Sequence, residues 1–275
     1  MENYWSDIEL KPGQTHTHQV GPVTIYLKKI ANEIWVAHKH LPAQQEGDKH
    51  DFRGSEDETA MNNSKEDPGL DWVRWALKED IYKFSFLPCF PDRPIVIKPD
   101  YPFKISKGAE ARIYSRVPVF VRVVPSDYPD FVITEIPTVI LSNTWFGAFT
   151  EGQLCYWLPT TARRSIDPEM FEQHMAVCTM QIKNNSQEEL KFENICLKVE
   201  RLSLYAKDEY LWADQSDITF QGEEKNCDIE MKGRLPVEAE GGKLITGPRT
   251  PIKKGFAELT FQRLKEFHPL GLIHS

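Results

Sequence analysis

The stretch AEARIYSRVPVFVRVV, residues 109–124, decides the fold class of this 275-residue chain. Apolar side chains recur at every second position, which is the period of a β-strand and not of a helix. We expect the odd positions to form a buried face: Ala109, Ala111, Ile113, Ser115, Val117, Val119, Val121 and Val123. The opposite face is then charged and aromatic, with Arg112, Tyr114, Arg116, Phe120 and Arg122. Pro118 interrupts the run and predicts a bulge or an edge position.

The sequence around this strand has the same two-residue period. Residues 21–40 predict two strands joined by a turn at 30–32, and residues 94–99 and 131–142 predict two more. Residues 43–69, which follow the first two of these strands, are polar and acidic and predict a long loop inserted between strands. The fold class expected is mostly β, with two antiparallel β-sandwich or barrel-like units and few short helices.

The chain also suggests a division into two domains. Residues 1–165 are expected to form a β-rich N-terminal domain, and residues 174–275 a smaller β-sandwich that includes a strand at 256–264. Between them, residues 166–173 read as a linker or short helix, because Asp167 can cap a helix that has Pro168 at its first position.

Composition restricts the class of partner and the compartment. The net charge is −8, which disfavours nucleic acid as a partner. The apolar runs are too short to span a membrane, and the first residues do not resemble a signal peptide, so we expect a cytoplasmic protein. The five cysteines, Cys89, Cys155, Cys178, Cys196 and Cys227, form no CxxC pair and are expected to be reduced and mostly buried.

Two histidine pairs are candidate metal ligands. His16 and His18 lie two residues apart, as do His38 and His40, so each pair can present both imidazoles on one face of a strand. If the strands approach, the four rings suit Zn²⁺ or a similar ion. The alternative is that His38 and His40 simply finish their strand, because they share its alternation with Ile34 and Val36.

Arginines and aromatic residues form a candidate ligand site. Arginine guanidinium groups bind carboxylates and phosphates through two hydrogen bonds, and aromatic rings stack on sugars. The candidate residues are Arg112, Arg116, Arg122, Trp145, Tyr156, Trp157, Arg163 and Arg164. The alternative is a solvated face whose arginines pair with the many acids of the chain.

No short catalytic or cofactor signature is present. The sequence lacks G-x-S-x-G, H-E-x-x-H, a P-loop and a G-x-G-x-x-G that opens a helix, so we expect no cofactor. The leading hypothesis is a non-catalytic cytoplasmic binding or assembly module. One rival is a subunit that works only when it is bound to another protein. The alternative is an enzyme that acts on a small anionic or sugar-like molecule at the arginine and aromatic face, because many active sites have no short signature.

The segment LSNTWFGAFTEGQLCYWLPTTARRS, residues 141–165, predicts a strand, a glycine-containing turn and a second strand. Its aromatic residues either pack on the core as cross-strand pairs or line a ligand cage. The T-W-F-G end of the first strand, the G-x-L-C-Y-W return and the basic pair resemble an uncharacterised prokaryotic family, number four hundred and thirty-two in the domain-of-unknown-function series. The resemblance extends loosely over residues 21–205 and implies no activity that can be transferred.

Overall fold

The computed structural model describes residues 5–41, 69–78, 80–99, 102–147, 149–150, 152–167, 170–222, 228–231 and 233–250. The predicted acidic loop, Pro168, Cys227 and the strand expected at 256–264 lie outside the described residues, except for Gly69 at the end of the loop. The prediction of a mostly β fold with antiparallel sheets is confirmed, and no helix of seven or more residues occurs among the described residues.

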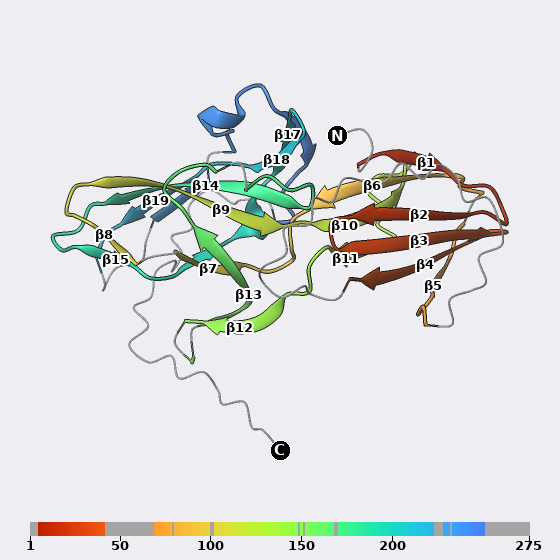
Figure 1. The fold of residues 1–275 in the computed structure, drawn as a ribbon, viewed down its shortest axis with the longest axis horizontal. Helices are drawn as coiled ribbons and strands as arrows, with labels where there is room; N and C mark the ends of the chain where they lie inside the picture. Colours follow the sequence, from red (N-terminus) through yellow and green to blue (C-terminus); the bar gives the residue numbers. More distant parts are fainter. Residues whose placement is uncertain are drawn as a thin grey trace, which may run out of the picture.

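Two four-stranded sheets form one end of the molecule, which we call the first sandwich (Figure 1). One sheet has the order β2 (Thr15–Val20), β3 (Val23–Ile30), β4 (Glu33–His40) and β5 (Val73–Ala76). The other has the order β1 (Asp7–Glu9), β6 (Lys83–Cys89), β10 (Phe120–Pro125) and β11 (Thr134–Pro137). Their inner faces share one apolar core, in which Phe84, Phe86 and Ile25 are fully buried. Each such side chain contributes about 1.5–3 kcal/mol to folding.

The remaining strands form the second sandwich around a separate apolar core. Its larger sheet has the order β20 (Asp228–Met231), β19 (Ser216–Phe220), β14 (Met175–Asn184), β18 (Tyr210–Ala213), β17 (Leu204–Lys207) and β21 (Lys243–Thr246), and β9 (Glu110–Pro118) pairs with β14. Its smaller sheet has the order β12 (Ser142–Phe146), β13 (Gln153–Ala162), β7 (Ile95–Pro99) and β16 (Ile195–Leu197). A short ladder joins β8 (Phe103–Ile105) and β15 (Leu190–Phe192).

Three strand pairs of the second sandwich are parallel, which the sequence did not predict. They are β13 with β7, β14 with β18, and β14 with β19. Two 3-10 helices, η2 (Val199–Arg201) and η3 (Val237–Ala239), complete the described elements. The division of the chain at residues 166–173 stays a prediction.

The single strand expected at 109–124 is two strands in two sheets. β9 ends at Pro118 and pairs with β14 in the second sandwich, whereas β10 begins at Phe120 and lies between β6 and β11 in the first. At the switch, the Val119 N–H donates to the carbonyl of His174 at 2.9 Å. The expectation that Arg122 shares a face with Arg112 is therefore wrong, because the interruption at Pro118 moves the chain from one sheet to another.

Candidate functional site

Two of the predicted arginines, Arg112 and Arg116, lie on one face of β9, and a third, Arg163, lies beside that strand; we call this surface the β9 face. Arg112, Tyr114 and Arg116 alternate along the strand, and Arg163 forms a β-bridge opposite Tyr114. An acid pairs with each guanidinium. The nitrogen–oxygen distances are 3.1 Å for Arg112–Glu238, 2.5 Å for Arg116–Glu172 and 3.2 Å for Arg163–Asp167. The arginines of this β9 face thus have anionic partners within the chain itself.

The Arg112 end of the β9 face is a partly buried hydrogen-bond network. The Tyr114 hydroxyl donates to Glu238 Oε1 at 2.7 Å, and Arg112 Nη2 donates to Gln215 Oε1 at 2.7 Å. Burial, and then the neighbouring Glu238 carboxylate, raise the pKa of Tyr114 to about 12. Among the described residues, Arg112 Nε, Glu238 Oε2 and Thr179 Oγ1 are buried without a hydrogen-bond partner. Thr179 lies directly opposite Tyr114 in the β9–β14 ladder.

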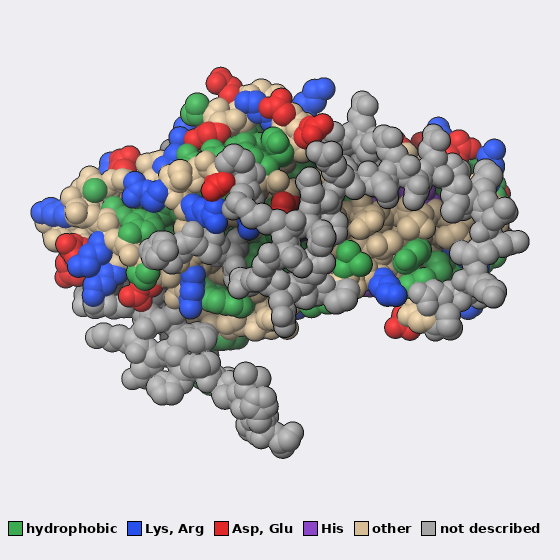
Figure 2. Space-filling view, in the orientation of Figure 1, with side chains coloured by type: hydrophobic (Ala, Val, Ile, Leu, Met, Phe, Trp, Pro, Cys, Tyr) green, Lys and Arg blue, Asp and Glu red, His purple; other side chains and the backbone are tan. Residues whose placement is uncertain are grey.

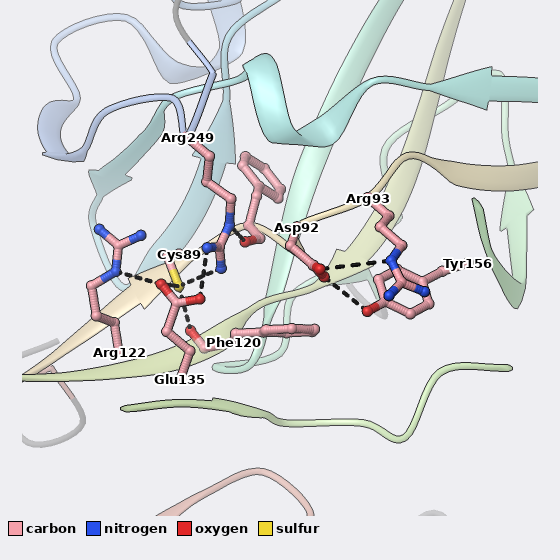
Figure 3. A network of polar contacts seen from close by, with 9 residues as sticks. Cys89, Asp92, Arg93, Phe120, Arg122, Glu135, Tyr156 and Arg249 are labelled. Atoms are coloured by element: carbon pink, nitrogen blue, oxygen red, sulfur yellow. Dashed lines mark hydrogen bonds and ion pairs between the residues drawn. The ribbon is translucent and has the colours of Figure 1, made fainter. Parts of the chain in front are cut away.

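A second polar network lies where the two sandwiches meet (Figure 3). Glu135 on β11 accepts from Arg122 Nε at 2.8 Å through Oε1 and pairs with Arg249 Nη1 at 2.6 Å through Oε2. Arg249 Nε donates to the carbonyl of Phe90 at 2.5 Å. We call these residues the junction cluster. It connects a strand of the first sandwich to the segment that follows β21 of the second.

Cys89 is the thiol of the junction cluster, and its surroundings keep it protonated. Its Sγ lies 3.3 Å from Arg249 Nη2 and 3.7 Å from Glu135 Oε1. Burial raises the pKa of Cys89 to about 12, although the Arg249 guanidinium opposes the shift. A thiol with this pKa is a poor nucleophile at neutral pH.

Tyr156 extends the polar contacts toward the β12–β13 hairpin (Figure 3). Its hydroxyl donates to Asp92 Oδ1 at 2.8 Å, and the guanidinium carbon of Arg93 lies 5.4 Å from its ring centroid. Arg93 Nη1 also donates to Asn143 on β12 at 3.0 Å. Burial and the Asp92 carboxylate raise the pKa of Tyr156, so it remains a neutral hydrogen-bond donor.

The hairpin predicted from residues 141–165 is confirmed, with β12 antiparallel to β13. Trp145 and Leu154 are direct cross-strand partners and are 44% and 45% exposed. Phe149, at the turn, is 93% exposed, whereas Phe146 is buried. The interpretation that the aromatic residues of this hairpin pack on the core therefore holds for Phe146 but not for Trp145 or Phe149. We call the side of the hairpin that carries Trp145, Leu154 and Tyr156 the hairpin face.

The remaining predicted ligand residues lie elsewhere. Trp157 is on the opposite side of β13 from the hairpin face, with Lys98 Nζ 4.7 Å from its ring centroid. The guanidinium carbon of Arg164 lies 5.6 Å from the ring centroid of Phe103. The structure thus brings together Arg112, Arg116 and Arg163, and it places Arg122, Trp145, Tyr156, Trp157 and Arg164 outside that group.

The two histidine pairs lie on β2 and β4, which are separated by β3. His18 and His38 both pair with Ile25, so one strand lies between them. The His18 ring stacks on Phe86 at a centroid distance of 3.8 Å, and His40 Nε2 lies 2.7 Å from the carbonyl oxygen of Pro137. In the described part of the chain, no group of three or more His, Cys, Asp or Glu residues could hold a metal ion.

Several residues of these networks carried no signal in the sequence. They are Asp92, Arg93, Glu135, Glu238 and Arg249. Asp92 and Arg93 are neighbours that also contact each other, but the other partners of all five residues are distant in the chain. Cys155 was interpreted as an inert buried thiol, and it is buried, but its Sγ lies 3.6 Å from that of Cys196. Only a correct strand order could have brought these two cysteines together.

The visible surface carries charges of both signs. In Figure 2, basic and acidic side chains are interspersed over the part of the molecule that contains β8, β15 and β19. Within the described ranges, no helix is long and apolar enough to cross a bilayer.

Comparison with known proteins defines the relationship of the chain but not its activity. No curated protein and no solved structure gives a significant match. One family profile matches residues 4–265, which is nearly the whole chain. The resemblance seen at the hairpin therefore extends over both sandwiches. The chain belongs to the family described as Protein of unknown function (DUF432).

Proposed function

We propose that this protein is a non-catalytic cytoplasmic assembly module that binds a second copy of itself through the hairpin face. The observation that carries the proposal is the exposure of apolar side chains on and beside one hairpin. Phe149 and Ile140 are 93% and 73% exposed, and the paired Trp145 and Leu154 are nearly half exposed. Contiguous exposed apolar residues with a polar rim are typical of protein interaction sites.

The position of β12 favours a second copy as the occupant. β12 is the edge strand of its sheet, and among the described residues only β13 pairs with it. An edge strand can pair with the same strand of a second molecule about a two-fold axis, which extends the sheet across the dimer.

The charges beside the hairpin face fit the same arrangement. Asp92 and Arg93 are adjacent and both contact the Tyr156 side chain, and Arg93 also reaches Asn143 on β12. A two-fold axis near β12 can place the Asp92 of one copy toward the Arg93 of the other, so the surface is self-complementary in charge. Tyrosine, tryptophan and arginine are also the residues most enriched at the centres of interfaces.

Sedimentation velocity over a range of concentrations tests this proposal. The wild-type chain should show a monomer–dimer equilibrium, and Leu154→Asp should shift it toward monomer by at least tenfold in Kd. Leu244→Asp is the matched control, because Leu244 is 61% exposed on β21 and should leave the equilibrium unchanged. A wild-type chain that remains monomeric at all concentrations, or equal effects of the two substitutions, would overturn the proposal.

A second candidate function is supported by the β9 face. Three buried polar atoms there, on Arg112, Thr179 and Glu238, have no described partner, and a hydroxyl-rich molecule could supply both donors and acceptors. We infer that a ligand or substrate of this site is sugar-like and not a simple anion, because acids already neutralise Arg112, Arg116 and Arg163. A thermal-shift screen with sugars and phosphorylated metabolites tests this candidate, since a bound ligand raises Tm. An unchanged Tm throughout would remove it.

A further inference from the structure

Cys155 and Cys196 form a thiol pair inside the smaller sheet of the second sandwich, apart from the hairpin face. Their strands, β13 and β16, lie on the two sides of β7, and the two Sγ atoms are 3.6 Å apart. Both side chains are fully buried, in a small cluster with Val96 and Phe146. The two thiols therefore meet in an apolar layer.

The intervening strand makes a disulfide between these cysteines unfavourable. Neighbouring strands lie about 4.8 Å apart, so two strands separated by a third lie about 9–10 Å apart. Disulfides need Cα atoms about 4.4–6.8 Å apart. The two sulfurs meet because both side chains extend across β7. A disulfide would require the backbones of β13 and β16 to move closer to each other.

The contact between the two thiols lowers the pKa of Cys155 and, together with burial, raises the pKa of Cys196, so one thiolate is favoured in the metal-free pair. Gln153 Nε2 lies 3.3 Å from Cys196 Sγ and can donate to it. Lys198, which is only 7% exposed, places its Nζ 2.5 Å from Gln153 Oε1. The nearby ammonium lowers the energy of a negative charge on either sulfur, whereas the Glu200 carboxylate opposes it.

We propose that Cys155 and Cys196 bind one soft monovalent metal ion, Cu(I), as a bis-thiolate site. Two metal–sulfur bonds of about 2.3 Å each span roughly 4.6 Å when the ion lies in line between the sulfurs. The thiols, which are 3.6 Å apart, must therefore separate by about 1 Å, a distance that rotation of the two side chains can supply. Thiolate ligands select soft ions such as Cu(I). Zn²⁺ is disfavoured because a structural zinc site needs four ligands and the described surroundings offer two thiols.

Charge balance supports a monovalent ion. Each thiol releases one proton to solvent on binding, so two thiols and one Cu(I) give a complex of charge −1 and two protons. The buried Lys198 ammonium compensates that single negative charge. The Glu200 carboxylate lies near Arg201, with 3.9 Å between Oε1 and Nε. The Arg201 guanidinium reduces the repulsion between that carboxylate and the negatively charged complex.

Anaerobic titration of the full chain with Cu(I), against a chromophoric Cu(I) chelator, tests the proposal. The Cys227→Ser chain serves as the background, so that this cysteine, which lies outside the described residues, does not contribute. We expect one Cu(I) per chain by native mass spectrometry, together with a thiolate-to-copper absorption band in the ultraviolet. Cys155→Ser and Cys196→Ser should each weaken binding at least a hundredfold, whereas Cys178→Ser, at another buried thiol, should not.

Near-ultraviolet circular dichroism of each apo variant checks that the substitutions leave the fold intact. Cys155→Ala provides a second variant if Cys155→Ser does not fold. Retention of Cu(I) by the Cys155 and Cys196 variants, or the absence of binding by the background chain, would overturn the proposal. Rapid formation of a Cys155–Cys196 disulfide with a thiol oxidant would also overturn it, because the argument requires β7 to hold the backbones apart.

Discussion

The Nη1 atom of Arg249 lies 2.6 Å from Oε2 of Glu135, and this ion pair joins the two sandwiches. Glu135 belongs to β11 of the first sandwich, whereas Arg249 follows β21 of the second. The Glu135 carboxylate also accepts from Arg122, and both arginines are about four-fifths buried. A carboxylate shared by two such arginines holds the sandwiches in one arrangement.

Replacing this carboxylate should destabilise the protein. Glu135→Gln preserves the shape of the side chain but leaves two partly buried guanidinium groups without their anion. We expect a loss of about 2–4 kcal/mol in the free energy of unfolding, measured by urea denaturation. Glu189→Gln removes an exposed partner of Lys104 and should cause little change. Equal effects of the two substitutions would show that the junction cluster is not a stabilising contact.

Gly21 should be intolerant of a side chain. Its φ is +53°, and a Cβ atom would lie 2.4 Å from Nδ1 of His174. Gly21→Ala should therefore cost about 1–3 kcal/mol more than Gly13→Ala, because Gly13 has a φ of +85° but a Cβ added there would meet no atom within 4 Å. Chemical denaturation measures both variants. His174→Ala should recover part of the loss in the Gly21→Ala chain, and a strictly additive double variant would contradict the steric explanation.

His174 should make the protein less stable in mild acid. Burial, together with the Arg116 guanidinium, lowers the pKa of His174 below 6.5, although Glu172 opposes the shift. The folded state thus favours the neutral ring, while the unfolded chain takes up a proton near pH 6.5. The stabilisation is present above pH 6.5 and is lost as the pH falls from there toward the lower folded-state pKa, with a slope of up to about 1.4 kcal/mol per pH unit.

The His174→Gln variant isolates this contribution. Its free energy of unfolding should change less between pH 7.5 and pH 5.5 than that of the wild type. His16 and His38 also have pKa values lowered by burial, but they are present in both proteins and their contributions cancel in the comparison. Identical pH dependence of the two proteins would exclude this role of His174.

Tyr114 and Glu238 should be energetically coupled. The 2.7 Å hydrogen bond between them lies partly buried between β9 and η3. Tyr114→Phe should cost about 1.5–3 kcal/mol, because the acceptor is charged. In a double-mutant cycle with Glu238→Gln, the interaction energy should exceed about 0.5 kcal/mol. Additive effects of the two substitutions would mean that the β9 face gains no stability from this contact.

The sequence predicts the local structure, namely the strands and the hairpins formed by strands that a short turn joins. The alternation of residues 21–40 and 141–165, with turns at 30–32 and near Gly147 and Gly152, predicted the β3–β4 and β12–β13 hairpins, which the structure confirms. Neighbouring strands joined by a short turn pair with each other, so the pattern alone specifies both the strands and their partners. The exposure of Phe149 could not be predicted in the same way, because its ring lies at the turn, beyond the ladder.

Only the tertiary structure decided which distant residues meet. The sequence determined that residues 109–124 are extended and which of their side chains are apolar, because a two-residue period depends only on neighbouring positions. It did not determine that the chain changes sheets at Val119, and so it placed Arg112 and Arg122 on one face. The Glu135–Arg249 pair and the Cys155–Cys196 contact depend on strand order, including a parallel β13–β7 pair, and strand order follows from the packing of the whole chain and not from any local pattern.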